Sequence, residues 1–273
     1  MRLGPPLLYA ATAGGVLLTA RAAVGQGLDV RWMATYLAGY VGLVAAGSML
    51  PGLAMWGDIV NRAPGARGVA LGFDDGPHPV HTRAVARALA KQRARATFFV
   101  IGEKAAAHPD VIRELRDAGH EIGVHGHRVD RFLGFRLLPA VREDFRRSVE
   151  TLERITGERP TLFRPPYGVT NPRILRAAEE HDLDVIGWSV RGLDGTARTS
   201  SEALATRVIR GLGPGAIACL HDAPEVGERV PAVIGALPRI LQEADARALP
   251  VVPVGELLDE VAGPTPGERQ DEG

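Results

Sequence analysis

The chain has 273 residues with 32 basic and 32 acidic side chains, so its formal charge at pH 7 is zero. This balance excludes the overall positive field that nucleic-acid-binding proteins use, and we expect no nucleic-acid partner. The length fits one α/β domain with a smaller segment outside it. The single cysteine, Cys219, excludes an internal disulfide, and within the apolar run 216–220 we expect a small buried hydrophobe rather than a reactive thiol.

The first 57 residues differ in kind from the rest. Residues 4–20 carry no charge and would form a helix about 25 Å long, slightly short of a bilayer core of about 30 Å. Residues 32–57 are also uncharged, and Trp32 and Trp56 lie near the ends, where interfacial aromatics belong. We therefore predict a membrane anchor over 1–57 with two transmembrane helices, at about 4–20 and 32–57. A cleaved signal peptide is the alternative for the first run, and the flanking arginines leave the orientation open.

Residues 58–68 contain a polar stretch rich in proline and glycine, which predicts a linker to a globular domain that starts near Val69. Residues 263–273 are rich in proline, glycine and charge without periodicity, so we expect a disordered tail. The globular domain is therefore predicted to span 69–262.

Short β-rich runs alternate with helical spacing throughout this domain. We expect strands at 69–71, 96–101, 121–124, 162–163, 183–190, 216–220 and 250–254. We expect helices at 80–92, 103–118, 139–155, 172–181, 201–211, 231–246 and from 255 onward. About seven β/α units of this kind predict an α/β fold with a parallel sheet closed into a barrel.

Two adjacent carboxylates, Asp74 and Asp75, follow the first of these strands. The Gly76-Pro77 pair ends the strand and leaves both acids at its carboxyl end, where α/β folds build their sites. Successive strand side chains point to opposite faces, so we expect one acid to hold a metal and the other to face a reacting group. The alternative is a helix N-cap with a spare acid.

Polar residues also follow four later strands. They are His125 and His127, Arg164 and Tyr167, Trp188 and Asp194, and His221 and Asp222. Strand ends converge on one face of a parallel barrel, so these groups should meet in one pocket. A single histidine is more often structural, but four successive strand ends with such groups predict an active site.

Three of these stretches resemble motifs of the polysaccharide deacetylase family, which is also carbohydrate esterase family 4, and the resemblance covers about 69–258. The family's Thr-Phe-Asp-Asp-Gly-Pro matches 72–77, its Arg-x-x-Tyr-Gly matches 164–168 and its Leu-His-Asp matches 220–222. The resemblance implies a distorted (β/α)7 barrel. It also implies a divalent metal, most often Zn²⁺, which polarises an N-acetyl carbonyl and its attacking water.

The resemblance also implies roles for individual residues. Asp74 would be the general base, Asp75 a metal ligand and His221 the general acid. Arg164 would hold Asp74 ionised, and Tyr167 would offer its backbone N–H to the oxyanion. These roles are chemically consistent, because a metal-bound water loses its proton near neutral pH and a histidine can protonate the departing amine.

One metal ligand of the family pattern is absent. The family has His-Ser/Thr-x-x-His, whereas this chain has His125-Gly126-His127-Arg128-Val129, and valine cannot bind a metal. His127 can share a face with His125 if the segment is extended, and Asp130 is a weaker substitute. We therefore expect Asp75, His125 and His127 to hold the ion.

The stretch that begins at Trp188 keeps only part of the family's Trp-x-x-Asp-x-x-Asp-Trp. Asp194 is the carboxylate expected to orient His221 and raise its pKa, and Gly195 leaves one wall of the pocket open.

We predict a membrane-anchored, metal-dependent hydrolase with its catalytic domain outside the cytoplasm. Its partner would be a carbohydrate, namely an N-acetylated amino sugar of a cell-envelope polysaccharide or a lipid-linked glycan. The alternative is a carbohydrate-binding descendant of the family that lost its metal through Val129. The complete set of acid and base residues favours the enzyme.

Overall fold

The computed structural model describes residues 4–25, 29–130, 132–195, 199–224, 227 and 229–262; the tail predicted at 263–273 lies outside this part of the chain. The strands are β1 (Val69–Asp74), β2 (Thr97–Val100), β3 (Glu121–Val124), β4 (Leu162–Phe163), β5 (Asp184–Val185), β6 (Val190–Arg191), β7 (Ile217–His221) and β8 (Val251–Val252). The helices are α1 (Gly4–Ala23), α2 (Val30–Met49), α3 (His81–Lys91), α4 (Gly102–Ala107), α5 (Pro109–Asp117), α6 (Leu138–Thr156), α7 (Pro172–Glu179), α8 (Ser201–Gly211), α9 (Val233–Ala246) and α10 (Val254–Ala262). Short 3₁₀ turns add η1 (Pro51–Leu53), η2 (Leu133–Phe135) and η3 (Pro166–Gly168).

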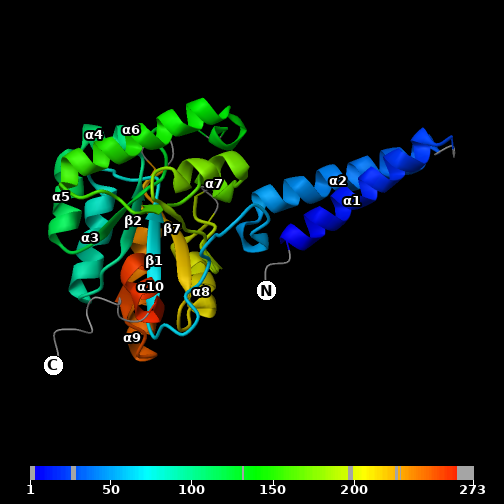
Figure 1. Ribbon diagram of the computed structural model, residues 1–273. Helices are drawn as coiled ribbons and strands as arrows, with labels where there is room; N and C mark the ends of the chain where they lie inside the picture. The colour runs from blue at the N-terminus through cyan, green and yellow to red at the C-terminus, as the bar shows by residue number, and fades with distance from the viewer. Residues whose placement is uncertain are drawn as a thin grey trace, which may run out of the picture.

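One parallel sheet forms the centre of the globular body (Figure 1). Its strand order is β5-β4-β3-β2-β1-β7-β6, with β8 paired to β1, and every pairing between these strands is parallel. Neighbouring helices pack side by side around it: α4 and α5 on α6, α6 on α7, α3 on α9 and α9 on α8. The predicted α/β class with a parallel sheet is therefore confirmed.

The sheet is a half-barrel rather than the closed barrel that we predicted. Among the described strands, no ladder joins β5 to β6 at the two ends of the order. The segment 60–62 fills this gap instead, because Val60 bridges to Ile186 and Arg62 bridges to Ala216. The sheet therefore includes residues that we had predicted to be a linker, and the globular part begins before Val69.

The position of segment 60–62 also explains why the strand predicted at 183–190 is two strands. Its halves, β5 and β6, lie at opposite ends of the sheet. Between them, the Gly187 N–H donates to the Val60 carbonyl at 2.8 Å, and the Val60 N–H donates to the Val185 carbonyl at 2.9 Å. A continuous apolar run cannot reveal such an interruption, because it comes from a segment more than 100 residues away. The helix predicted at 103–118 is also divided, since Pro109 starts a second helix, α5.

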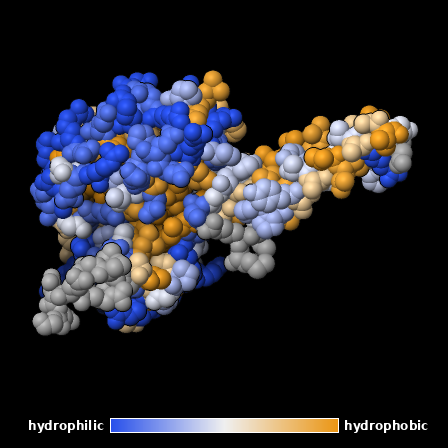
Figure 2. Space-filling model, in the orientation of Figure 1, coloured by the Kyte–Doolittle hydropathy of each residue, from blue (hydrophilic) through white to orange (hydrophobic). Residues whose placement is uncertain are grey.

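Helices α1 and α2 form an antiparallel hairpin that projects from the globular body (Figure 1). We predicted transmembrane helices at 4–20 and 32–57, but α2 ends at Met49, where Leu50 adopts an extended conformation before Pro51. Within the described residues, no helix combines the length and the hydrophobicity that a membrane crossing requires, so the predicted transmembrane anchor is not supported. Both helices contain glycine, threonine, tyrosine and one arginine, which lower their mean hydropathy. Figure 2 shows hydrophobic residues mixed with more polar ones along the hairpin.

The base of the hairpin contacts the loop that carries η3. The Thr170 N–H donates to the Ser48 carbonyl at 2.8 Å, and the Trp56 indole N–H donates to the Ser48 hydroxyl at 3.1 Å. The hairpin is thus attached next to Tyr167, one of the predicted site residues.

Strand β1 lies in the middle of the core. All six of its residues are buried, and the rings of Phe73 and Phe98 stack with centroids 5.1 Å apart. A strand covered on both faces is typical of parallel sheets. Its last residue, Asp74, is therefore a carboxylate inside the core, and such a group must have a charged or hydrogen-bonding partner.

Candidate active site

A cavity of about 360 Å³ opens at the carboxyl ends of β1, β3 and β7. Five of the eight predicted site residues line it, namely Asp74, Asp75, His125, Tyr167 and His221. Two others, Arg164 and Asp194, are buried and contact members of those five, whereas His127 lies elsewhere. Residues at the carboxyl ends of β1, β3, β4 and β7 thus line one cavity.

Arg164 is the buried partner of Asp74. The guanidinium is fully buried, and its Nη1 donates to Asp74 Oδ1 at 2.9 Å. It also lies over the Phe99 ring, with Cζ 4.1 Å from the centroid, and donates to the Gly187 carbonyl at 3.3 Å. Gly72 makes room for it, because a Cβ there would lie 2.3 Å from Nη1. The guanidinium of Arg164 thus occupies the space next to Gly72 in this chain, whereas the family motif has threonine at position 72.

Two opposing effects act on the pKa of Asp74. Burial alone would raise it, but the positive charge of Arg164, helped by His125 and His221, outweighs burial and lowers the pKa below its usual value. The carboxyl is therefore ionised throughout the neutral range. An ionised carboxylate in the floor of a cavity can accept a proton from a bound water.

His221 faces Asp74 across the sheet. The two residues are direct partners in the register of β1 and β7. The His221 Nδ1 lies 2.9 Å from Asp194 Oδ1, and the His221 backbone N–H donates to Asp194 Oδ2 at 3.1 Å. Burial disfavours the imidazolium, but the hydrogen bond and the charge of Asp194 dominate and raise the pKa of His221 to about 9. The imidazole is thus protonated at pH 7 and can donate a proton.

Asp75 reaches the same cavity as Asp74, although strand alternation predicts opposite faces. Strand β1 ends at Asp74, and Asp75 adopts a left-handed backbone conformation with φ +72°. Asp75 therefore lies outside the strand, and the alternation of strand side chains between two faces does not apply to it. Its Oδ1 lies 3.6 Å from His125 Nε2, and burial raises its pKa, although His125 and His221 oppose this.

His125 is held in the orientation that a metal ligand needs. Its Nδ1 lies 2.8 Å from the Arg164 carbonyl, which can only accept, so Nδ1 carries a proton and the ring directs Nε2 toward Asp75. Two donors of one tetrahedral zinc, each about 2.0–2.1 Å from the ion, lie roughly 3.3 Å apart. The Asp75–His125 pair therefore fits two positions of such a site.

His127 is not brought to this pair. Gly126 has φ +88°, so the segment is not extended and the two histidines do not share a face. The backbone N–H of His127 donates to Asp144 Oδ1 at 2.9 Å, and the imidazole ring of His127 lines a separate hollow beside α6. The prediction of an extended segment at 125–127 is therefore wrong, and the structure does not support His127 as a third metal ligand.

Val129 occupies the wall of the cavity next to the two donors. Its side chain is 41% exposed, so the position lies at the rim rather than in the core. Asp130 lines the same cavity, but its Oδ1 accepts from the Phe132 N–H and its Oδ2 accepts from Arg136. Among the described residues, the Asp75–His125 pair thus lacks the third protein ligand of a catalytic zinc site.

Backbone conformation also marks this cavity. Asp75, Tyr167 and Leu193 all line it, and all have positive φ, at +72°, +57° and +60°. Non-glycine residues in this region are uncommon and cluster at functional sites. Gly195 lies beside His221, where an added Cβ would come within 3.3 Å of the ring, so its lack of a side chain leaves His221 accessible.

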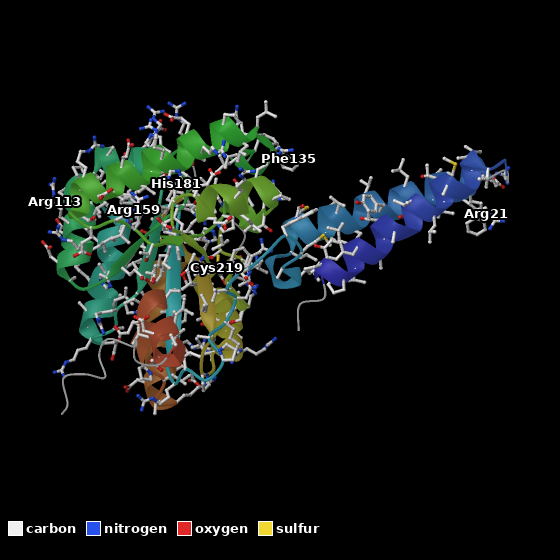
Figure 3. The ribbon with its side chains drawn as sticks, in the orientation of Figure 1. Arg21, Arg113, Phe135, Arg159, His181 and Cys219 are labelled. Atoms are coloured by element: carbon white, nitrogen blue, oxygen red, sulfur yellow. The ribbon has the colours of Figure 1, made fainter. Side chains whose placement is uncertain are left out.

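Cys219 is the residue whose position the sequence interpretation missed. It is buried, as predicted, but it also lines the cavity, and its thiol donates to Asp74 Oδ2 at 3.3 Å (Figure 3). Burial, and next the charge of Asp74, raise the pKa of this thiol well above its usual value. The signal was available, because residues 219 and 221 lie two apart on β7 and share a face.

Comparisons with known proteins agree with this geometry. The polysaccharide deacetylase family profile matches residues 61–186. A peptidoglycan-N-acetylglucosamine deacetylase from Bacillus cereus is 30% identical over 70% of this chain and 87% of the relative. A chitooligosaccharide deacetylase from Bradyrhizobium is 35% identical over 60% of this chain and 74% of the relative.

Solved structures show the same fold. A family pseudoenzyme from Bacillus anthracis superimposes with a TM-score of 0.68 over 76% of this chain and 72% of that chain, at 22% identity. This likeness is one of fold alone, so fold does not separate active from inactive members. Some curated relatives are much longer, and this chain spans 33% of one of them. The sequence relationship, the shared fold and the motif residues around one cavity show that the chain belongs to the polysaccharide deacetylase family.

Proposed function

We propose that the protein is a metal-dependent hydrolase that removes N-acetyl groups from amino sugars of a cell-envelope glycan. The observation that carries this proposal is the pairing of an ionised Asp74 with a protonated His221 at facing strand ends of one cavity. Each has a buried partner of opposite charge, Arg164 and Asp194. The Bacillus and Bradyrhizobium relatives, whose names specify peptidoglycan and chitooligosaccharides, support the class of substrate.

In this mechanism Asp74 takes a proton from water as the water oxygen attacks the acetyl carbonyl carbon. Arg164 keeps Asp74 ionised until that step. Tyr167, which lines the cavity in a left-handed turn, would stabilise the oxyanion with its backbone N–H. His221 then donates its proton to the amine nitrogen as the C–N bond breaks, and Asp194 holds the imidazole in place.

Asp75 and His125 would hold the divalent ion, most often zinc in this family. When bound, such an ion polarises the carbonyl and lowers the pKa of water. Val129 leaves the ion with two protein ligands, so we expect weak binding. Weak affinity makes activity depend strongly on the concentration of added metal.

The test is acetate release by the purified protein from N-acetylglucosamine oligosaccharides and from peptidoglycan. We expect release that rises with added Zn²⁺ or another divalent ion and stops with a chelator. The matched control is Asp74→Asn, which preserves the shape of the side chain. Equal release by wild type and Asp74→Asn would contradict the proposal.

A carbohydrate-binding protein without activity is the second candidate, and Val129 is the observation that favours it. Such a protein would bind the oligosaccharides, release no acetate at any metal concentration and gain no activity when Val129→His restores an imidazole. Activity in Val129→His but not in wild type would show that wild type is inactive because it lacks a metal ligand at position 129.

We also propose that the domain lies outside the cytoplasm, because peptidoglycan, the glycan in the name of the Bacillus relative, belongs to the cell envelope. Protease added to intact cells with a permeable outer layer should then digest the part after Gly68. Protection until lysis would place it inside and favour a different substrate.

A further inference from the structure

Cys219 and the two proton-transferring residues form a cluster of sulfur, nitrogen and oxygen donors. Among the described residues, Asp74, Cys219 and His221 are the one group of three histidine, cysteine or acidic side chains whose ligand atoms all lie within 4.8 Å of one another. The donor set suits zinc and cadmium, because thiolate and imidazole select thiophilic ions over Mg²⁺ or Ca²⁺. Asp75 and His125 line the same cavity but do not belong to this group.

His221 has the hydrogen-bonding arrangement of a metal-binding imidazole. Its Nδ1 is occupied by Asp194, which leaves Nε2 as the atom available on the cavity side. A carboxylate in this position fixes the orientation of a ligating ring. Gly195 adds no side chain over the ring, so an ion can approach it.

The charges of the cluster also balance a divalent ion. Asp74 supplies one negative charge, and Cys219 supplies a second when its thiol proton passes to solvent on metal binding. Arg164 is bonded to Oδ1 of Asp74, whereas Cys219 contacts Oδ2, so the oxygen on the thiol side does not share the guanidinium. The thiolate and the Oδ2 oxygen can therefore face the ion together.

We propose that Asp74, Cys219 and His221 capture the thiophilic divalent ion Cd²⁺, and that this ion inhibits the enzyme. The ion would replace the Nε2 proton of His221, which passes to solvent, and would occupy a lone pair of Asp74, so neither residue could transfer a proton. The binding follows from the cluster alone, and only the inhibition rests on the proposed deacetylase function. The proposed mechanism does not use Cys219, so the thiol is free for this second role.

The binding test titrates the full-length, metal-free protein with Cd²⁺ and records the ultraviolet charge-transfer absorption of a cadmium-bound thiolate. Cys219 is the only cysteine of the chain, so this absorption reports on one position. We expect a saturable band in wild type and none in Cys219→Ser or Cys219→Ala. His125→Ala removes the other ion position and should keep the band. Mg²⁺ should produce no band in any variant.

Acetate release gives the second readout. In Cys219→Ser, the Cd²⁺ concentration for half-inhibition, measured against the uninhibited rate of that variant, should rise at least about tenfold, the low end for a weakened metal site. Circular dichroism shows whether both Cys219 variants fold. If they do not, His221→Gln replaces them, and it should weaken Cd²⁺ binding by a similar factor.

Several results would overturn the proposal. One is the absence of a thiolate band in wild type, and another is a band that disappears in His125→Ala, because the ion would then lie with Asp75. Unchanged Cd²⁺ inhibition in Cys219→Ser, or unchanged Cd²⁺ binding in His221→Gln, would do the same. If wild type releases no acetate under any condition, the proposed function fails, while the absorption still decides whether this cluster binds the ion.

Discussion

Two sides of the same cavity hold their polar groups in different ways. The acid–base side consists of Asp74, Arg164, Asp194 and His221, and three of these four are almost completely buried. The metal side consists of Asp75, His125 and Val129, and it ends at a residue that is 41% exposed. The acid and base residues that the family resemblance implies are all present on the acid–base side, whereas the metal side lacks one imidazole of the family pattern.

Burial explains why the two sides tolerate change differently. Removing one partner of a buried ion pair such as Arg164–Asp74 leaves an uncompensated charge, which costs about 3–5 kcal/mol of folding free energy. A change at the exposed rim position of Val129 carries no such cost. The buried ion pairs of the acid–base side therefore also stabilise the fold, whereas a substitution at the exposed end of the metal side costs the fold little.

The largest expected effect separates the two sides directly. Asp74→Asn removes the base but keeps a hydrogen-bond acceptor for Arg164, so acetate release should fall at least about a hundredfold, the low end for loss of a general base. Ion binding by Asp75 and His125, measured by calorimetry, should persist. If the ion is lost with Asp74, the two adjacent acids have exchanged their proposed roles.

Asp194→Asn should alter the acid–base side through pH. A hydrogen bond to a charged group is worth about 1.5–3 kcal/mol, so the pKa of His221 should fall by about one to two units from about 9. The alkaline limb of the pH–rate profile should move to lower pH accordingly. An unmoved limb would show that another group controls it.

Stability provides an independent readout of the same pair. Because the folded-state pKa of His221 is raised above its ordinary value of 6.5, its stabilising contribution is complete below about pH 6.5 and is lost as pH rises through about 9. Wild type should therefore lose free energy of unfolding over this interval in urea titrations. Asp194→Asn should lose less over the same interval.

Val129→His tests whether the metal side is one ligand short. A second imidazole would give the ion a third protein ligand and should raise its affinity at least about tenfold, because catalytic zinc sites use three protein ligands. Acetate release at low metal concentration should rise with it. Unchanged affinity would mean that residue 129 does not face the ion.

The smallest effect is expected from His127→Ala. The ring lies in a different hollow from Asp75 and His125, so ion content and activity should stay near those of wild type. Elemental analysis of the purified variant measures this. Loss of the ion would show that His127 is a metal ligand and that the site does not need a ligand at position 129.

The class of the fold and most residues of the site could be predicted from the sequence alone. Period-two and helical spacing identified the alternating strands and helices, because these patterns are local consequences of burial on one face. The convergence of strand ends then placed Asp74, His125, Tyr167 and His221 around one pocket, since parallel strands deliver their carboxyl ends to the same edge.

How those residues face one another depends on the tertiary structure. Backbone turns with positive φ at Asp75 and Gly126 override strand alternation, so Asp75 enters the cavity and His127 leaves it. Val60 bridges to Ile186 at the gap between β5 and β6, where no ladder closes the predicted barrel. The contact between Cys219 and Asp74 depends on the pairing of β1 with β7, which joins residues 145 positions apart. Local patterns do not record such pairings, because contacts distant along the chain are set by packing of the whole domain.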